Sequence, residues 1–187
     1  INEYFSGKIF DSIDVAADNL TVTTGRKSKM DFANLLPIKQ ILVTRNGHPR
    51  ITSLNQLAKE TIIVAKGTSY YDNIKDKEKN LKKTFKYHFS ENAESQVTDL
   101  LGEKGTVTIL DSNLAAMAIT EKDQILHAAV SKKQYVGWGV KTGASDIASK
   151  LNEYISSIKK DDTLSNTWDK YIEGIELADY LAIAGGY

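Results

Sequence analysis

The turn Lys66-Gly67-Thr68-Ser69 is the first place in the sequence where chemistry could sit. It follows the apolar run "TIIVA" and precedes a polar run with helical character that begins at Tyr70. Free backbone N–H groups at the start of a helix favour an anion, so the turn has the form of a small cradle for a phosphate or a carboxylate. No GxxxxGK[ST] or GxGxxG pattern frames it, which argues against a nucleotide.

Two charged residues that lie far apart in the chain, Arg26 and Asp111, are further candidates. Arg26 follows a polar stretch that contains Thr21 and Thr23, and a guanidinium can clamp a carboxylate with two hydrogen bonds. Asp111 ends a strand, and open α/β sheets bind ligands at the carboxyl ends of their strands. The plainer readings are that Arg26 is one of 24 basic residues on a surface loop and that Asp111 caps the next helix. The residues alone leave both readings open.

Patterns for metal, thiol or serine chemistry do not occur in the sequence. His48, His88 and His127 have no HxH or HxxxH spacing, there is no GxSxG, and there is no cysteine. We therefore expect no metal and no cofactor. A pair of carboxylates for glycoside hydrolysis is compatible with 24 acids but is not indicated by any spacing. Asn19-Leu20-Thr21 fits a glycosylation sequon, a pattern that is frequent by chance.

Short apolar strands alternate with amphipathic helices, which predicts an α/β fold with a parallel or mixed sheet covered on both faces. The predicted elements, in chain order, are a helix ending near Gly7, a strand at 10–18, a loop at 19–29, strands at 40–45, 61–65, 84–89 and 106–110, helices after Asn92 and over 113–119, an extended run at 135–140 and two closing helices. The two closing helices should bury stripes made of Ile147, Leu151, Ile155 and Ile158, and of Leu164, Trp168, Tyr171 and Ile175.

Composition excludes several classes of protein. The 187 residues carry 24 basic and 24 acidic side chains, and this balance argues against a nucleic-acid binder that works through a wide basic face. The apolar runs fall far short of the ~20 residues that a membrane-spanning helix needs. The sequence starts at Ile1 without a leader, and we expect any export signal to have been removed or to lie outside it.

Several stretches together resemble the extracellular solute-binding proteins of family 3, which have the two-lobed type II periplasmic binding fold. The resemblance runs from about Phe5 to Tyr171 and is carried by "GKIFDSIDVAADNLTVTTGRKSKMDFANLLP", "ITSLNQLAKETIIVAKGTSYYDNI", "TVTILDSNLAAMA" and "VGWGVKTGASDIASKLNEYISSIKKDDTLSNTWDKYI". Within that family, "LVTRNGHPRITSLNQL", "DSNLA" and "VGWGV" look closest to the non-catalytic domain of membrane-bound lytic transglycosylase F.

The resemblance implies an organisation in two lobes. Lobe one would comprise residues 1–38 and 136–187 and would be incomplete at its N-terminus, and lobe two would comprise residues 39–135. The hinge would lie at the two crossings between the lobes. The tail from Ile172 onward does not align and could begin a linker.

The resemblance also implies roles for individual residues. Arg26 would pair with a ligand carboxylate, Thr21 would face the ligand, and Asp111 would accept an α-ammonium group. Thr68 and Ser69 would offer backbone N–H and hydroxyl groups. One departure is Asn19, which stands where the family usually has a glycine at the start of the ligand-facing loop.

The function implied is that of a periplasmic or otherwise extracytoplasmic binding module for a small zwitterion, either an amino acid or a cell-wall peptide. It would catalyse nothing, and a membrane permease or an attached lytic transglycosylase domain would read its closed state; any membrane anchor would lie outside this chain. The alternative is an enzyme on the same scaffold, a lyase or hydrolase acting on a small carboxylate. Glu91 and Glu121 lie outside the matched positions, which weakens that alternative.

Overall fold

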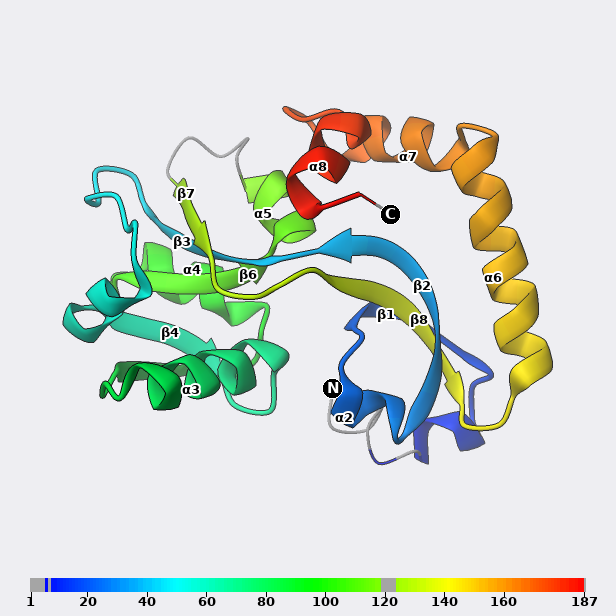
Figure 1. The fold of residues 1–187 in the computed structure, drawn as a ribbon, viewed down its shortest axis with the longest axis horizontal. Coiled ribbons are helices and arrows are strands. Elements are labelled where there is room, and N and C mark those ends of the chain that lie inside the picture. Colours follow the sequence, from blue (N-terminus) through cyan, green and yellow to red (C-terminus); the bar gives the residue numbers. More distant parts are fainter. Residues whose placement is uncertain (1–5, 7, 119–123, 187) are drawn as a thin grey trace. The chain divides into compact units, whose positions relative to one another are not determined.

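The computed structural model describes residue 6, residues 8–118 and residues 124–186 (Figure 1). The chain divides into two compact units, Ile1–Ile38 with Lys133–Tyr187, and Lys39–Lys132. Residues 133–135, which we expected in lobe two, fall in unit 1. The reason is that strand β8 starts at Gln134 and pairs with β2 from that residue onward.

Unit 1 contains a three-stranded antiparallel sheet in the order β1-β8-β2. Its strands are β1 (Val15–Thr21), β2 (Met30–Ile38) and β8 (Gln134–Lys141). Gly137 of β8 lies opposite Leu20 on one side and Asn34 on the other. A Cβ at Gly137 would lie 2.5 Å from the carbonyl oxygen of Ala33, so the close approach of backbone here requires glycine.

The expected loop at 19–29 is partly wrong. β1 continues through Thr21, and helix α2 (Thr24–Lys27) follows it. Polar residues here read as a loop, but Leu20 and Thr21 pair with β8, which lies more than a hundred positions further along the chain. Both residues are buried, at 2% and 3% exposure. The helix expected to end near Gly7 lies outside the described residues, and a 3-10 turn η1 (Lys8–Asp11) precedes β1.

Three helices, α6 (Ser145–Lys160), α7 (Thr163–Tyr171) and α8 (Leu177–Ala184), complete unit 1. The stripe of α6 is buried at Ile155 and Ile158, as its spacing predicts. The stripe of α7 is wrong at its end, because Tyr171 is 66% exposed and α7 stops before Ile175.

The tail that we expected to begin a linker instead forms α8, which packs within unit 1. The Tyr180 ring lies 4.4 Å from that of Trp168, and its hydroxyl donates to the carbonyl oxygen of Pro37 at 2.7 Å. Trp168 Nε1 donates to the carbonyl oxygen of Ile175 at 2.8 Å and fixes the corner between α7 and α8.

Unit 2 contains a five-stranded mixed sheet in the order β5-β4-β6-β3-β7. The strands are β3 (Gln40–Arg45), β4 (Thr61–Ala65), β5 (Lys86–Ser90), β6 (Val107–Asp111) and β7 (Gln124–Ala129). β4 runs parallel to β5 and β6, whereas β3 runs antiparallel to β6 and β7. Four of these strands lie where the apolar runs predict them, and β7 was missed.

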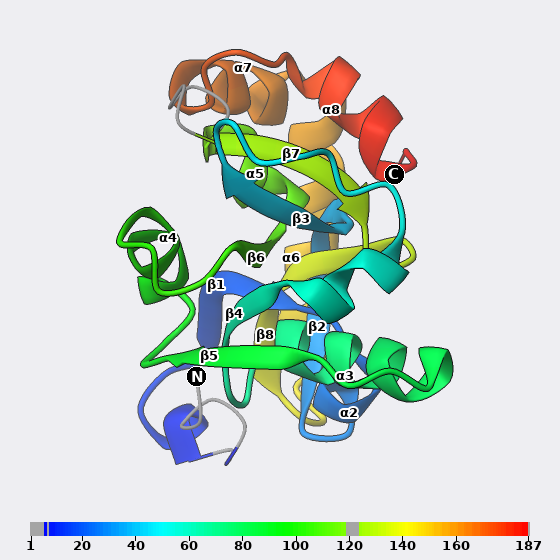
Figure 2. The same ribbon diagram turned by 90° about the vertical axis from the view of Figure 1, so that its left-hand side faces the viewer.

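Helices cover both faces of this sheet, as Figure 2 allows the reader to follow. They are η2 (Leu54–Lys59), α3 (Ser69–Leu81), α4 (Ser95–Leu101) and α5 (Ser112–Ala118). Ile74 of α3 packs in one core with Leu42 and Ile62, whereas Leu100 of α4 packs in another with Val43 and Ile63. Alternate residues of a strand point to opposite faces, so neighbours 42 and 43, and 62 and 63, fill different cores.

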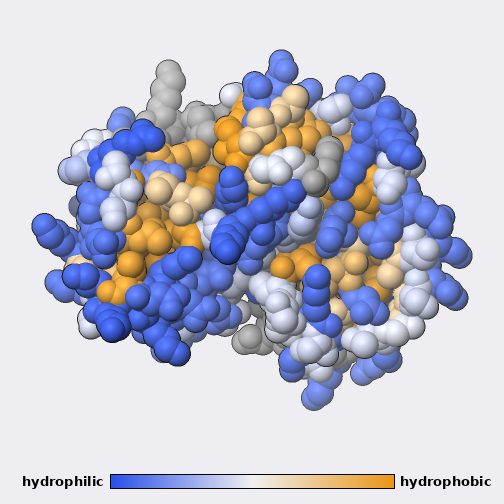
Figure 3. All heavy atoms as spheres, in the orientation of Figure 1, coloured by the Kyte–Doolittle hydropathy of each residue, from blue (hydrophilic) through white to orange (hydrophobic). Residues whose placement is uncertain are grey.

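The surface drawn in Figure 3 is mostly hydrophilic, with hydrophobic residues showing between the polar ones. Among the described residues, no helix has the length and apolarity needed to span a bilayer.

Candidate functional site

In unit 1, Arg26 is held by residues close to it in the sequence. Thr23 caps α2, and its Oγ1 accepts a hydrogen bond from the Arg26 backbone N–H at 3.2 Å. The guanidinium Nη1 donates to the carbonyl oxygen of Thr21 at 3.0 Å. A guanidinium keeps its charge at all physiological pH values and offers five donors, so this contact anchors a fixed cation beside the end of β1.

Thr21 and Asn19 lie on the strand that leads to this cation. Thr21 is buried, whereas Asn19 is exposed where the pairing of β1 with β8 changes register. The Asn19 backbone N–H donates to Asp18 Oδ1 at 2.7 Å. The structure thus groups Thr21 directly with Arg26 and places Asn19 two positions before Thr21 on an irregular strand.

In unit 2, the turn singled out in the sequence forms the N-terminus of α3. Thr68 is its N-cap: Oγ1 accepts from the Tyr71 N–H at 3.3 Å and donates to the carbonyl oxygen of Ala65 at 2.7 Å. Thr68 and Ser69 are each only 5% exposed. The hydroxyl of Thr68 therefore ties the start of the helix to the end of β4 and fixes the position of Ser69.

The side chain of Ser69 contacts a residue that sequence reasoning missed. Gln40 Nε2 donates to Ser69 Oγ at 3.0 Å, and Gln40 Oε1 accepts from Asn73 Nδ2 at 2.7 Å. Gln40 is fully buried at the start of β3. In the sequence, the only sign of Gln40 as a residue of interest was a polar side chain at the start of the otherwise apolar run "QILV".

Asp111 is the last residue of β6 and is 1% exposed. It lies opposite Gln40 in the antiparallel pairing of β6 with β3. Its backbone N–H donates to the Tyr70 hydroxyl oxygen at 3.3 Å, which links it to the first turn of α3. Helix α5 starts directly after it, at Ser112, whose Oγ accepts from the Lys39 N–H at 3.1 Å.

Three of the predicted residues, Thr68, Ser69 and Asp111, are therefore brought together in unit 2, with Gln40 between them. Thr21 and Arg26 are brought together in unit 1. Chemically, the unit 1 group offers a fixed cation, and the unit 2 group offers a carboxylate with hydroxyl and N–H groups beside it. Of the acids considered for enzymatic chemistry, Glu91 is exposed and Glu121 lies outside the described residues.

The far end of α3 carries a second buried carboxylate, Glu78, which is 7% exposed. Its Oε1 accepts from the Phe85 N–H at 2.6 Å, and its Oε2 accepts from Lys75 and from the Tyr87 hydroxyl. Burial raises the pKa of Glu78, but these hydrogen bonds outweigh burial and leave the pKa below its usual value. Burial, together with the Glu78 charge, raises the pKa of Tyr87.

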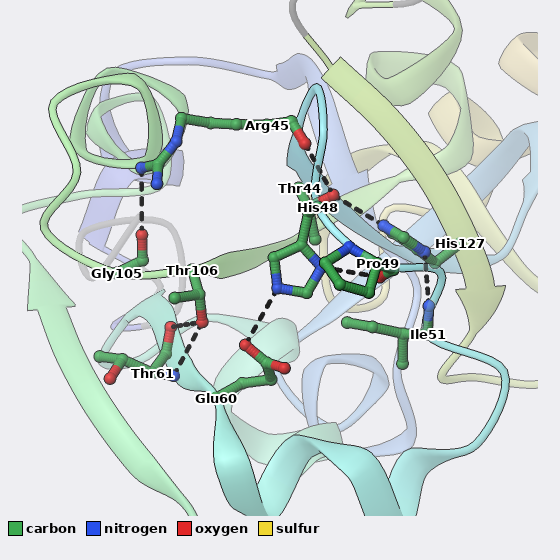
Figure 4. A network of polar contacts seen from close by, with 10 residues as sticks. All are labelled: Thr44, Arg45, His48, Pro49, Ile51, Glu60, Thr61, Gly105, Thr106 and His127. Atoms are coloured by element: carbon green, nitrogen blue, oxygen red, sulfur yellow. Dashed lines mark hydrogen bonds and ion pairs between the residues drawn. The ribbon is translucent and has the colours of Figure 1, made fainter.

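Two of the histidines meet in unit 2, away from these groups (Figure 4). The rings of His48 and His127 lie edge to face at 6.1 Å between centroids. His127 Nδ1 accepts from the Ile51 N–H at 3.0 Å, and Nε2 lies 2.7 Å from Thr44 Oγ1. His48 Nε2 lies 3.2 Å from Glu60.

This histidine pair is a structural contact. Burial lowers the pKa of His127, and the nearby His48 lowers it further, so the neutral ring holds the chain at Ile51. His88 lies elsewhere and contacts Asp99 at 3.4 Å. Within residues 8–118 and 124–186, no three His, Cys, Asp or Glu side chains gather in a way that could hold a metal ion.

The two-unit α/β architecture is that of the type II periplasmic binding proteins. The cysteine-binding protein from Campylobacter jejuni matches with a TM-score of 0.79 and 17% identity, over 91% of this chain and 68% of that one. The arginine-binding protein of T. maritima, solved as its P235GK mutant, matches with a TM-score of 0.78 and 18% identity, over 93% of this chain and 75% of that one. At these identities the likeness establishes the fold.

The chain belongs to the bacterial extracellular solute-binding proteins, family 3, whose family model matches residues 6–174. A membrane-bound lytic murein transglycosylase F from Pseudomonas putida is 27% identical over 89% of this chain, and a glutamine-binding protein of an ABC transporter from Bacillus subtilis is 26% identical over 86% of it. The chain spans 35% of that transglycosylase and 58% of that transporter protein. These relatives agree with the family that the sequence motifs indicated.

Proposed function

We propose that this chain is an extracytoplasmic binding module that closes on a small zwitterion, an α-amino acid or a cell-wall peptide, without changing it chemically. The proposal rests on one observation: the predicted ligand residues gather into two groups of complementary chemistry, a cation on unit 1 and a carboxylate on unit 2. A zwitterion carries one charge of each sign, so it needs one fixed cation and one fixed anion in its site.

Each charge has a role in this proposal. The Arg26 guanidinium pairs with the ligand carboxylate, and Thr21 lines the same group. The Asp111 carboxylate accepts the α-ammonium group, while Thr68 and Ser69 offer hydroxyl and N–H groups. Thr68 caps α3 and its hydroxyl donates to the end of β4, so the start of α3 is held in place, as a ligand-binding position requires.

Binding energy drawn from both units favours a closed state, and the output of the module is that shift in population. The hinge in this proposal consists of the two chain crossings near residues 37–40 and 133–137. A membrane permease or an attached lytic transglycosylase domain reads the closed state. Both kinds of protein occur among the relatives by name, a transporter's binding protein and a membrane-bound transglycosylase.

The test is isothermal titration calorimetry with the standard L-amino acids and with muropeptides, followed by chromatography of the recovered ligand. We expect saturable binding of at least one zwitterion and its recovery unchanged. Conversion of the ligand would favour a lyase or hydrolase on the same scaffold, and a complete absence of binding across both sets would contradict the proposal.

A further inference from the structure

The segment that joins β3 to η2, residues 46–53, is tied to β7 through the side chain of His127 (Figure 4). The Ile51 N–H donates to His127 Nδ1 at 3.0 Å, and the Ile51 side chain is 2% exposed in the core that also holds Leu57 and Tyr70. His127 is itself 8% exposed. The bond therefore fixes the segment at a buried point, where a polar group that loses its partner is costly.

The partners of His127 determine which ring nitrogen carries the proton. A backbone N–H can only donate, so Nδ1 must offer a lone pair to Ile51. On the other side of the ring, Thr44 Oγ1 donates its single proton to the Arg45 carbonyl oxygen at 3.2 Å, so it accepts from His127 Nε2 at 2.7 Å. Both contacts require the same neutral tautomer, with the proton on Nε2.

A second proton on the His127 ring is incompatible with this arrangement. It would lie on Nδ1 and point at the Ile51 N–H, so that two donors would face each other. It would also place a charge in a buried position, and burial, His48 and Arg50 all lower the pKa of His127. Glu60 lies 3.2 Å from His48 Nε2 and raises the pKa of His127, but its effect is the smallest of these.

His48, on the segment itself, tolerates the proton that His127 does not. Its Nδ1 lies 2.8 Å from the Pro49 carbonyl oxygen, and its Nε2 lies 3.2 Å from Glu60 Oε2. Both partners are oxygen acceptors, so a ring protonated at both nitrogens keeps both contacts. Acid therefore disrupts the bond at Ile51 while the contacts of His48 persist.

We propose that His127 is a pH-operated latch for residues 46–53: the neutral ring holds the segment at Ile51, and a proton on Nδ1 releases it there. The opened segment leaves His127 to titrate at its ordinary pKa of about 6.5, whereas the pKa in the closed segment is lower. The latch therefore stabilises closure above about pH 6.5, and that contribution is lost as the pH falls toward the lowered value. The latch does not depend on the proposed function, because no ligand takes part.

Amide hydrogen exchange followed by NMR on the ligand-free chain tests the latch. The protection of the Ile51 amide, corrected for intrinsic exchange, should fall by up to about 10-fold per pH unit below about pH 6.5, because opening takes up one proton. Ala65 provides the matched control, since its N–H donates at 2.9 Å to Gln96 Oε1, an acceptor that does not titrate. Its protection should stay within about 2-fold over the same range. Equal losses at Ile51 and Ala65 would mean that acid unfolds unit 2 as a whole, and the proposal would be wrong.

Two variants should change this response in different ways. His127→Asn keeps an acceptor near the position of Nδ1 but has no proton to gain, so the protection of the Ile51 amide should vary by less than about 2-fold with pH. His48→Gln removes a charge that opposes protonation of His127, so the loss of protection should begin at a higher pH, together with the change in the nitrogen NMR signals of the His127 ring.

Titration of the His127 ring without a loss of protection at Ile51 would overturn the proposal, and so would an unchanged loss in His127→Asn. If His127→Asn does not fold, the His48 variant and the comparison of Ile51 with Ala65 in the wild-type chain decide the question. None of these results bears on amino-acid binding, so failure of the latch and failure of the proposed function are distinguishable.

Discussion

Arg26 is held by residues three and five positions away, whereas the Ser69 hydroxyl is held by Gln40, 29 positions away in the chain. The cation of unit 1 belongs to a four-residue helix at the end of a strand. The polar groups of unit 2 belong to three elements, β3, β6 and α3, joined by buried bonds. The hydrogen bonds of Arg26 therefore join positions close in sequence, although Thr21 itself is buried and pairs with β8, whereas those of the second group join buried residues far apart in sequence.

This difference predicts that the two groups respond differently to substitution. A change at the Arg26 side chain should alter binding more than stability, because the side-chain hydrogen bond described above joins it to Thr21, only five positions away. A change in the unit 2 network should alter both, because the same hydrogen bonds satisfy buried polar groups.

The largest expected effect is that of Arg26→Ala on affinity. Loss of the guanidinium would leave a ligand carboxylate without its counter-charge, which costs about 3 kcal/mol or roughly 100-fold in Kd. The melting temperature should change little. Calorimetry with the tightest-binding amino acid measures the effect, and Lys27→Ala, an exposed neighbour on the same helix, is the control. Equal affinities of the Arg26 variant and wild type would refute the assignment.

Gly137→Ala should have the largest effect on stability in unit 1. Its Cβ would lie 2.5 Å from the Ala33 carbonyl oxygen, so the strands would have to separate, at a cost of about 2–3 kcal/mol. Gly25→Ala is the matched control: nothing lies within 4 Å of its Cβ, and alanine in a helix should stabilise by about 0.5 kcal/mol. Urea unfolding of both variants measures the contrast. A Gly137 variant as stable as wild type would show that the sheet is looser than described.

Asp111→Asn should weaken amino-acid binding by about 10- to 30-fold, since a neutral amide of the same shape cannot balance an α-ammonium charge. Asp72→Asn, an exposed position in the first turn of α3, serves as the control for the loss of one negative charge. If the two variants lose affinity equally, the effect is one of net charge and Asp111 has no specific role.

Glu78→Gln tests how much the buried carboxylate near the C-terminal end of α3 contributes to stability. The pKa of Glu78 is lowered in the folded chain, so its charge stabilises the fold above its ordinary pKa of about 4.5, and that contribution is lost as the pH falls through the lowered value. The free energy of unfolding of wild type should exceed that of the variant by about 1 kcal/mol at neutral pH, and this difference should shrink in acid. Unfolding from about pH 3 to 7 measures it. A stability difference that grows as the pH falls would contradict the lowered pKa assigned to Glu78.

Much of the fold was accessible from the sequence because its signals are local. The run "TIIVA" and the extended run 40–45 correspond to β4 and β3, and Gly102 ends α4 as predicted. The errors arise where contacts with residues far away in the sequence determine the secondary structure. Leu20 and Thr21 were predicted as loop but pair with β8, and the predicted α7 stripe extends one turn too far because α7 ends at Tyr171 and the chain turns toward α8.

The same distinction applies to the site. Arg26, Thr68, Ser69 and Asp111 were singled out because turns, strand ends and family motifs mark them. Gln40 was missed because its meaning lies in contacts with Ser69 and Asn73, which are 29 and 33 positions away. A single glutamine before an apolar strand carries no pattern that would predict those partners.

The most direct test of whether opposite charges on the two units bind one zwitterion is calorimetry with a set of ligand analogues on a set of variants. The tightest-binding amino acid is compared with its α-carboxamide and with its analogue lacking the α-amino group, on wild type, Arg26→Ala and Asp111→Asn. We predict that wild type prefers the amino acid over both, that the Arg26 variant loses the preference over the carboxamide, and that the Asp111 variant loses the preference over the deaminated analogue. Wild-type preferences retained in both variants would contradict the account.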